Sequence, residues 1–503
     1  MRAESPVNVL LFNPPRYASG RFHKFNNALV WLASHLHRNG VSARVVPLND
    51  ERYAERVREE IERHRPRIAA ISCKWWDTLY SSARVAELVK RVDPDTLTVA
   101  GGHTASFFAR ELAERTAFDA VIRGDGEVPL LELANGEQPA NCAFTGVEEP
   151  PPIEECYSHG EGNIGEIGLV DDIAGLVSDP GIIGSFVWTG KGCLERCVHC
   201  SGSVWNTARR FGRRELVYRP RESVLADVEI LSRLPGHERI TFDFEPTRGP
   251  VQDGYYLDLF GALEPKRLAA YFFCWSLPSV ELIDALAETF VFVELCVDVQ
   301  TGSEPLRREL ADQGFLKPFF SDAQFESAME RVERHSNFIV DASTMTGLPF
   351  ERSDDLERIV AFADRIYDRF ESLRYPYVSP MNVEPGSLLH DRPGDYGMVL
   401  FREGFDDFFE YTRRSFEQNL NCYQPERYDD GRFHPLGVAS KESCERGDPL
   451  RAYEDWKRIQ AHVDRRSAEK MLLRVRKYKQ FGLSKIGVKG GTDRGSFGGE
   501  EVE

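Results

Sequence analysis

Three of the chain's ten cysteines lie within eight residues of one another, in the segment GCLERCVHC at residues 192–200. Thiolates bind zinc and iron well, and thiols pair as disulfides in oxidising compartments. Cys193, Cys197 and Cys200 are therefore candidate metal ligands with the spacing C-x3-C-x2-C. Arg196, which lies between them, either influences the charge around such a metal or pairs with an acid at the surface.

Three kinds of cysteine site compete for this spacing. Disulfide frameworks belong mainly to short secreted chains, whereas this chain has 503 residues and shows neither a signal segment at its start nor an apolar run of about twenty residues. We therefore expect a cytoplasmic protein without a membrane span. A structural zinc site needs a fourth ligand, and the upstream Cys142 and Cys156 form no C-x-x-C pair. Zinc is thus weakly supported, and an iron–sulfur cluster, in which three thiolates leave one iron open for a substrate, is favoured.

The first 135 residues alternate between short β-branched runs and one-sided helical patterns. Ala54, Val57 and Ile61 have helical spacing, as do the apolar residues between Val85 and Val92. Strands that alternate with such helices predict a doubly wound parallel α/β sheet, which is Rossmann-like. The expected strands are 7–12, 41–48, 68–73, 96–100 and 118–122.

Ligands of such sheets bind at the carboxyl ends of the strands. Three segments follow expected strand ends: NPPR, AGGHTASF and RGDGE. Their glycines let the backbone approach a ligand closely, although tight turns would explain them equally well. A dinucleotide fingerprint is missing from the first strand–helix turn. The candidate binding residues at these ends are Asn13, Pro14, Gly101, Gly102, His103, Gly124, Gly126 and Glu127.

A second alternation of strands and helices begins at residue 183, after an irregular stretch rich in Pro, Gly and acids that reads as a linker over 136–182. A helical pattern follows Ser353, which we expect to be its N-cap. Six strand–helix units predict a partial (β/α)6 barrel, whose functional groups lie at the carboxyl ends of the strands. The cysteine motif follows the first of them. The expected strands are 183–188, 239–244, 270–275, 292–299, 338–344 and 373–379.

The cysteine motif and the later strand ends resemble those of radical S-adenosylmethionine (SAM) enzymes. That resemblance implies a 4Fe-4S cluster whose open iron binds SAM, with His199 at the place of an aromatic residue before the third cysteine. ITFDFEP, VDVQTGS, TMTGLPFE and NVEPGSLL resemble the family's later strand ends. Gln300 stands where the family usually has glutamate, so that contact to the SAM ribose loses a charge. The implied SAM-binding residues are His199, Asp243, Glu245, Asp298, Gln300 and Gly347.

The N-terminal segments NVLLFNPP, VAGGHTASFFARELAE and DAVIRGDGEVPLLEL resemble the cobalamin-binding domain that is fused to one large class of radical SAM enzymes. Mutase-type cobalamin domains carry D-x-H-x-x-G, and the segment around His23 does not fit it. The resemblance therefore implies cobalamin without a histidine ligand below the cobalt. Trp75 and Trp76 either shield that lower face or simply pack.

The C-terminal part is expected to be mainly helical over 401–486. An aromatic helix around Phe408 either completes a substrate cavity or packs in a core, and a basic helix over 451–480 most simply presents a solvated face. The Gly-rich tail is expected to be disordered. The resulting division is 1–135 cobalamin-binding-like domain, 136–182 linker, 183–400 radical SAM barrel, 401–486 helical region and 487–503 tail.

The resemblance implies an enzyme, and three functions remain open. The leading one is a cobalamin-dependent radical SAM methyltransferase that acts on an unactivated carbon or a phosphorus of a small metabolite. The second keeps both cofactors and makes a rearranged or cyclised product, and the third is a non-catalytic cobalamin or iron–sulfur sensor. An electron donor such as flavodoxin or ferredoxin is implied as a partner. The net charge of −17 argues against nucleic acid as a partner.

Overall fold

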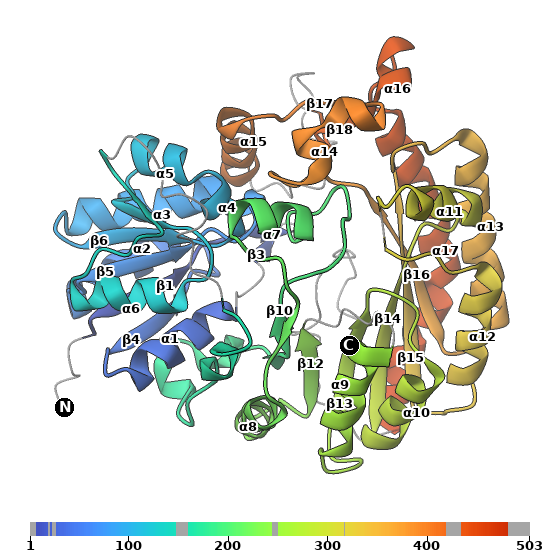
Figure 1. Ribbon diagram of the computed structural model, residues 1–503, viewed down its shortest axis with the longest axis horizontal. Coiled ribbons are helices and arrows are strands. Elements are labelled where there is room, and N and C mark those ends of the chain that lie inside the picture. Colours follow the sequence, from blue (N-terminus) through green and yellow to red (C-terminus); the bar gives the residue numbers. More distant parts are fainter. Residues whose placement is uncertain are drawn as a thin grey trace.

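The structure, a computed structural model, describes residues 7–18, 21–22, 27–146, 159–243, 250–315, 317–418 and 434–480. Two six-stranded sheets dominate it, each covered by helices, and they lie on opposite sides of the molecule (Figure 1). The segments that carry the cysteines and the RGDGE motif lie between them. This arrangement confirms the expected sheet followed by a partial barrel.

The first sheet has the strand order β4-β1-β5-β6-β7-β8. All its neighbouring strands are parallel except β7 and β8. β8 was not predicted, because its three residues lie in the stretch that reads as a linker. The strands are β1 Val9–Asn13, β4 Ala43–Pro47, β5 Ile68–Ser72, β6 Leu97–Gly101, β7 Ala120–Ile122 and β8 Cys142–Phe144.

Both faces of this sheet are buried. In β1, Val9 and Leu11 pack into one core and Leu10 and Phe12 into another, as expected for a sheet with helices on both sides. A short hairpin, β2 Tyr17–Ala18 with β3 Arg21–Phe22, follows β1. The helices are α1 Ala28–Arg38, α2 Tyr53–His64, η1 Trp76–Thr78, α3 Leu79–Val92, α4 His103–Phe107, α5 Ala109–Arg115 and α6 Glu127–Asn135.

The second sheet is wholly parallel and open, with the order β16-β15-β14-β13-β12-β9. Three short 3-10 helices precede it: η3 Ile164–Glu166, η4 Ala174–Leu176 and η5 Pro180–Ile182. The strands are β9 Phe186–Trp188, β12 Arg239–Asp243, β13 Ala269–Cys274, β14 Phe292–Gln300, β15 Phe338–Thr346 and β16 Leu373–Pro380. All six match predicted strands to within three residues.

Helices and one hairpin connect these strands. The hairpin, β10 Gly190–Lys191 with β11 Val217–Tyr218, flanks the cysteine motif. The helices are α7 Val204–Arg210, α8 Arg221–Ser232, α9 Pro250–Gly261, α10 Val280–Thr289, α11 Glu304–Asp312, α12 Asp322–Val332 and α13 Ser353–Arg369. The predicted N-cap Ser353 is wrong: it is the first helical residue of α13, and the backbone N–H of Arg352 donates to Asp355 Oδ2 at 2.9 Å instead.

The C-terminal part returns to both sheets. α15 packs across α3, and Phe405, Phe408 and Tyr411 belong to a core of the first sheet. The long α17 packs along β16 and buries Tyr453 and Ile459, so one side of this helix covers the barrel's edge strand. The elements are α14 Leu388–Asp391, η6 Pro393–Tyr396, β17 Met398–Leu400, α15 Phe405–Glu417, β18 Val438–Ser440, α16 Lys441–Glu445 and α17 Arg451–Gln480.

No helix within the described ranges is both long and apolar enough to cross a bilayer. The tail 487–503, which was predicted to be disordered, lies outside the described residues, as does His23.

Candidate functional site

The cysteine loop, residues 192–203, begins with a glycine that no other residue could replace. Gly192 has φ +101°, and a Cβ there would lie 2.1 Å from the carbonyl oxygen of Glu215. The chain therefore turns sharply out of the β10–β11 hairpin immediately before Cys193. The glycine that opens the motif is thus explained by close backbone packing.

Backbone N–H groups of this loop hold two of the three thiols in place. Cys193 and Cys197 are buried and Cys200 is half-buried. The N–H of Glu195 donates to Cys193 Sγ and the N–H of Gly202 to Cys200 Sγ, each at 3.3 Å. Burial raises the pKa of Cys197 to about 12, with Lys317 partly opposing the rise, and burial and Glu384 raise the pKa of Cys200 well above its ordinary value. Only a bound cation would hold such thiols as thiolates at neutral pH.

The three cysteine thiols do not all lie close together in this structure. Among the residues that the structure describes, only Asp125, Glu127 and His159 bring three ligand atoms of the His, Cys, Asp or Glu type within 4.8 Å of one another. At least two of the cysteine thiols therefore lie more than 4.8 Å apart, whereas zinc ligands at bond lengths of about 2.3 Å lie about 4 Å apart. Cys142, the possible fourth ligand, is buried in the core around the first sheet.

Loops from the far side of the barrel hold the cysteine loop in place. Val198 donates its N–H to Phe315 O at 3.0 Å and accepts from Leu389 N at 2.8 Å. His199 offers its carbonyl to Glu384 N at 3.1 Å, and the Glu384 carboxylate accepts from both the N–H and the hydroxyl of Ser201 at 2.7 Å. The NVEPGSLL segment after β16 thus supports the motif directly.

Gln300, at the end of β14, is the most unusual residue of the barrel interior. It has φ +70° and is 1% exposed, and neither the nitrogen nor the oxygen of its side-chain amide has a hydrogen-bond partner among the described residues. A buried amide without partners costs free energy, so its presence here points to a ligand that would satisfy it. Two residues earlier, Asp298 forms an ion pair with Lys317. The charge of Lys317 also opposes the rise in the pKa of Cys197.

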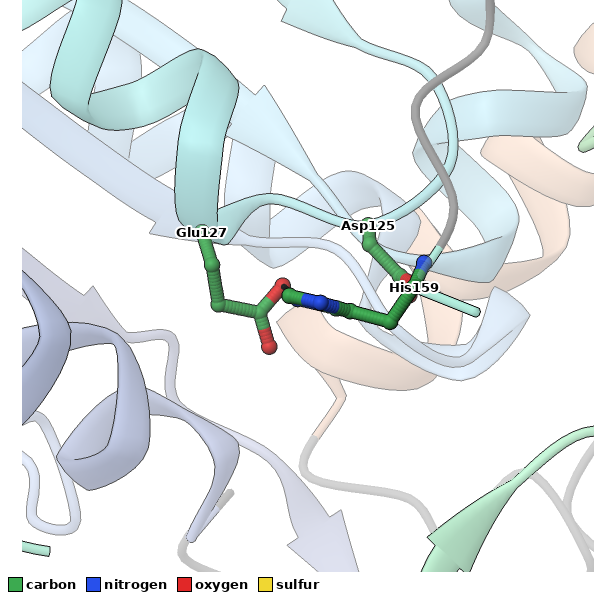
Figure 2. A group of neighbouring side chains, drawn as sticks. All are labelled: Asp125, Glu127 and His159. Atoms are coloured by element: carbon green, nitrogen blue, oxygen red, sulfur yellow. Dashed lines mark hydrogen bonds and ion pairs between the residues drawn. The ribbon is translucent and has the colours of Figure 1, made fainter. Parts of the chain in front are cut away.

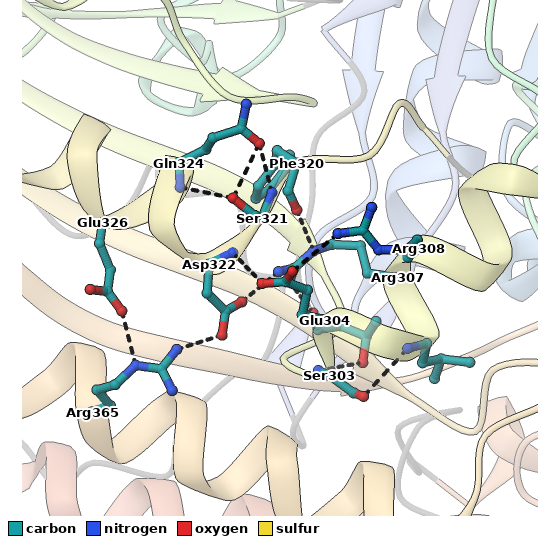
Figure 3. Close-up of polar contacts among 12 residues, drawn as sticks. Ser303, Glu304, Arg307, Arg308, Phe320, Ser321, Asp322, Gln324, Glu326 and Arg365 are labelled. Carbon is teal, nitrogen blue, oxygen red and sulfur yellow. Dashed lines mark hydrogen bonds and ion pairs between the residues drawn. The ribbon is translucent and has the colours of Figure 1, made fainter.

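A buried arginine fixes the turn that carries Gln300. Arg307, on α11, donates to Thr301 O at 2.6 Å, to Phe320 O at 2.9 Å and to Asp322 Oδ1 at 2.5 Å (Figure 3). Next to it, Gly302 has no room for a Cβ, which would lie 2.9 Å from Ile359 Cα. The QTGS segment is therefore rigid, and Gln300 is held in its strained backbone conformation by its surroundings.

The other predicted SAM-binding residues are placed less completely. Asp243 ends β12, and Glu245 lies outside the described residues. Gly347, with φ +77°, donates its N–H to Glu351 Oε1 at 2.8 Å. Burial raises the pKa of Glu351 to about 8, against the effect of that hydrogen bond.

At the first sheet, the loops after β5 and β6 meet closely. A Cβ on Gly102 would lie 2.7 Å from Lys74 Cα, so this position requires glycine, whereas Gly101 has open space beside it. His103 stacks on Trp75 with ring centroids 6.5 Å apart, and Trp75 remains 38% exposed. Burial and the nearby Lys74 lower the pKa of His103 to about 4, so the ring is neutral at pH 7.

The remaining residues predicted at this sheet are placed as follows. Asn13 and Pro14 are buried at the end of β1, and Gly124, with φ +86°, donates its N–H to Ser106 Oγ at 3.1 Å. Gly126 is the residue before α6. Trp76, unlike Trp75, is buried against Phe408 and Tyr411 of α15, so it packs in a core.

The RGDGE segment joins the two halves of the molecule through a buried charge network. Lys191, two residues before Cys193, lies 2.8 Å from Glu127 and 3.2 Å from Asp125. Arg213 also pairs with Asp125, and His159 Nε2 lies 3.3 Å from Glu127 (Figure 2). Burial alone would raise the pKa of Glu127, but Lys191 and His159 hold it well below its usual range. The two cations balance the two carboxylates, which argues against a metal ion here.

Sequence reasoning missed three members of this network. His159 lies in the stretch that reads as a linker, and Lys191 and Arg213 flank the cysteine loop without any motif of their own. The one feature of the sequence that singled out Lys191 was its position directly before Gly192. That position does not indicate which carboxylate Lys191 pairs with.

Comparison with known proteins supports both halves. Residues 20–134 match the B12 binding domain family. Over 131 residues the chain is 34% identical to the hopanoid C-3 methylase of Methylococcus capsulatus, and over 131 residues it is 29% identical to the anaerobic magnesium-protoporphyrin IX monomethyl ester cyclase of Rubrivivax gelatinosus. These matches cover 24% and 25% of this chain, and only 25% and 23% of the respective relatives.

Solved structures share the fold over most of the chain. The radical SAM methyltransferase TsrM of Kitasatospora setae, solved with cobalamin and a [4Fe-4S] cluster, has a TM-score of 0.59 at 17% identity and covers 79% of this chain and 81% of its own. OxsB, a cobalamin-dependent SAM radical enzyme solved with aqua-cobalamin and SAM, has a TM-score of 0.57 at 12% identity. The match covers 95% of this chain and 76% of the OxsB chain. The predicted resemblance is confirmed for the B12 binding domain and for the fold, and the predicted cofactors are those bound in these neighbours.

Proposed function

We propose that the chain is a cobalamin-dependent radical SAM methyltransferase that methylates an unactivated carbon, or a phosphorus centre, of a small metabolite. The observation that carries this proposal is the junction at Lys191. It ties the strand-end loop of a B12 binding domain to the residues immediately before a buried three-cysteine loop. A substrate between the two halves could reach both cofactors.

The structure supports a division of roles among the predicted residues. Cys193, Cys197 and Cys200 would hold the cluster, since all three lie in one loop, Cys193 and Cys197 are buried, and backbone N–H groups donate to the thiols of Cys193 and Cys200. Gln300 would meet SAM, because its buried amide lacks partners. When bound, the cluster supplies one-electron cleavage of SAM and the cobalamin supplies methyl transfer. The loops with Gly101, Gly102, His103 and Trp75 would border the cobalamin at the carboxyl end of the first sheet.

A burst experiment tests the methyl-transfer function without knowledge of the substrate. The protein is loaded anaerobically with cluster and reduced cobalamin and is then given SAM. We expect about one equivalent of S-adenosylhomocysteine per cobalamin, because a methyltransferase must take its methyl group from SAM. A Cys200→Ala variant should keep this burst and lose 5′-deoxyadenosine. Deoxyadenosine without S-adenosylhomocysteine would contradict methyl transfer.

The similarity to a cyclase favours one second candidate, a rearrangement or cyclisation that uses the same two cofactors. Such an enzyme would consume SAM at the cluster alone. The same experiment separates the candidates, since only methyl transfer produces S-adenosylhomocysteine.

A further inference from the structure

An open cavity of about 750 Å³ lies on the outer side of the cysteine loop. Four of the side chains that line it are arginines: Arg196 of the loop itself, Arg209 and Arg210 of α7, and Arg214 just beyond. Among the described residues that line it, Asp391 is the only acid. This surface is strongly basic in a protein whose net charge is −17.

Most of these charges are not neutralised by the protein. Within the described part of the chain, Arg196, Arg209 and Arg214 form no ion pair, whereas Arg210 lies 3.7 Å from Asp391. Asp391 is also engaged by the indole N–H of Trp205 at 3.1 Å. Free guanidinium groups around a concavity attract an anionic partner and speed its approach.

The aromatic centre of the cavity, Trp205, is contacted by one arginine of the lining, Arg209, and by Arg392, which does not line the cavity. The guanidinium of Arg209 lies 3.6 Å from the ring centre of Trp205, and that of Arg392 lies 5.1 Å away on the same indole. Tryptophan and arginine together are the residues that most often dominate protein interfaces. The cavity is open and most of its lining side chains are charged, which suits a protein surface.

The cavity adjoins the predicted cluster without belonging to the predicted SAM or cobalamin sites. Val204, in its lining, donates its N–H to Glu195 O at 2.9 Å, and Arg196 lies between Cys193 and Cys197. One layer of loop therefore separates this surface from the thiols. Among the residues that the structure describes, none of those predicted to bind SAM or cobalamin lines the cavity.

We propose that this arginine-lined cavity is the docking surface for a small acidic one-electron carrier protein that reduces the cluster. The proposal rests on the proposed function, since only a cluster that cleaves SAM must be supplied with an electron. In this step the reduced carrier loses one electron and the cluster gains one, and no bond or proton is transferred. The arginines bring the acidic surface of the carrier against the loop that covers the cluster.

The test compares electron delivery in native protein, in an Arg209→Glu/Arg214→Glu variant and in an Arg58→Glu/Arg334→Glu variant. The control reverses two exposed arginines far from the cavity and changes the net charge equally. Reduced flavodoxin is mixed anaerobically with each protein, and cluster reduction is followed by stopped-flow absorbance. We expect reduction of the first variant to be slower by about tenfold or more at low ionic strength, and the control to match native protein. The native rate should fall as salt is added.

Two further measurements distinguish failure of the docking surface from failure of the proposed function. Binding of oxidised flavodoxin, measured by calorimetry, should weaken in the glutamate variant and persist in an Arg209→Lys/Arg214→Lys variant that retains the charge. Reduction to completion with excess dithionite should give the same reduced-cluster signal in all variants, so an absent signal in native protein would refute the proposed function instead. Equal flavodoxin rates in all variants would overturn the docking surface. If the glutamate variant loses dithionite-driven turnover but is still reduced by flavodoxin at the normal rate, the arginines bind a small anionic ligand. That result would also overturn the docking surface.

Discussion

Gln300 shows how a single residue can carry information about a missing ligand. It holds a left-handed backbone conformation, which non-glycine residues seldom adopt, and its buried amide has no partner within the described structure. Both features cost free energy in the free protein. They are explained together if the turn is built to present that amide to SAM.

A Gln300→Asn substitution should therefore weaken SAM binding. Asparagine tolerates the positive φ but withdraws the amide by one methylene, so the expected loss is about tenfold in affinity, the value of one buried hydrogen bond. Calorimetric titration of the cluster-loaded protein with SAM measures it. The exposed Gln313→Asn serves as control. Equal affinity in both variants would show that Gln300 does not contact SAM.

Glu351 makes the stability of the fold depend on pH, and the direction of its pKa shift fixes the sign of that dependence. Burial raises its pKa to about 8 from an ordinary value of 4.5, so between these values the folded protein binds more protons than the unfolded chain. Stability contributed by the protonated carboxyl is present in full below pH 4.5 and is lost as the pH rises through 8.

Replacement of this carboxyl by an amide should flatten that dependence. Glu351→Gln keeps an oxygen that can accept from Gly347 N–H and cannot ionise. The fall in melting temperature between about pH 6 and pH 8.5 should be smaller in the variant than in native protein. Identical falls in both proteins would contradict a raised pKa at this residue.

At the scale of elements, α15 has an unexpected place. The sequence left open whether its aromatic stripe completes a cavity or packs in a core, and the structure places it in a core of the first sheet. Phe408 is 1% exposed and lies 5.8 Å from the rings of both Trp76 and Phe108. The helix is therefore part of the first domain, although the barrel separates them in the chain.

Removal of the Phe408 side chain should loosen the B12 binding half. Phe408→Ala is expected to cost about 3–5 kcal/mol, the usual price of a large buried aromatic. Hydrogen exchange should accelerate in α3 and β5 in particular. Phe401→Ala, at a residue 42% exposed, is the matched control and should leave exchange in these elements unchanged. Faster exchange confined to the C-terminal region would refute this placement.

The elements that could be predicted are those whose own residues suffice to specify them. All the expected strands of both sheets were found, because continuous β-branched runs need no knowledge of distant partners. β8 was missed because it has only three residues, which lie in the stretch that reads as a linker and carry too little pattern. Likewise, Gly102 and Gln300 were recognised from local motifs, whereas His159 joined the site only through Glu127, which is far away in the sequence.

At the scale of the molecule, Lys191 is one of two cations among the described residues, the other being Arg213, that pair with the RGDGE segment and so connect the two halves. It neutralises Asp125 and Glu127 of the first domain from a position beside the cysteine loop. If it is removed, buried carboxylates lose a partner, which generally costs about 3–5 kcal/mol. The position of the loop relative to the first sheet would be lost with it.

Lys191→Met should therefore uncouple the two halves. We expect a lower melting temperature and a single thermal transition that splits in two, as seen by calorimetry. Adding Glu127→Gln to this variant should restore part of the loss, because one of the unpaired charges is then gone. Lys441→Met, at an exposed lysine, is the control. If the double variant melts at a lower temperature than Lys191→Met alone, Lys191 acts through packing and not through its charge.

The return of α15 to the first sheet also sets an order of events during biosynthesis. The ribosome releases the B12 binding segment first, but Phe405, Phe408 and Tyr411 emerge only after the entire barrel has been translated. Until then, Trp76 and Phe108 face solvent on the nascent chain, where chaperones can bind them. Cobalamin loading is accordingly expected to follow completion of the chain, and a gene fragment encoding residues 1–135 alone would yield a protein with an uncovered, aggregation-prone face.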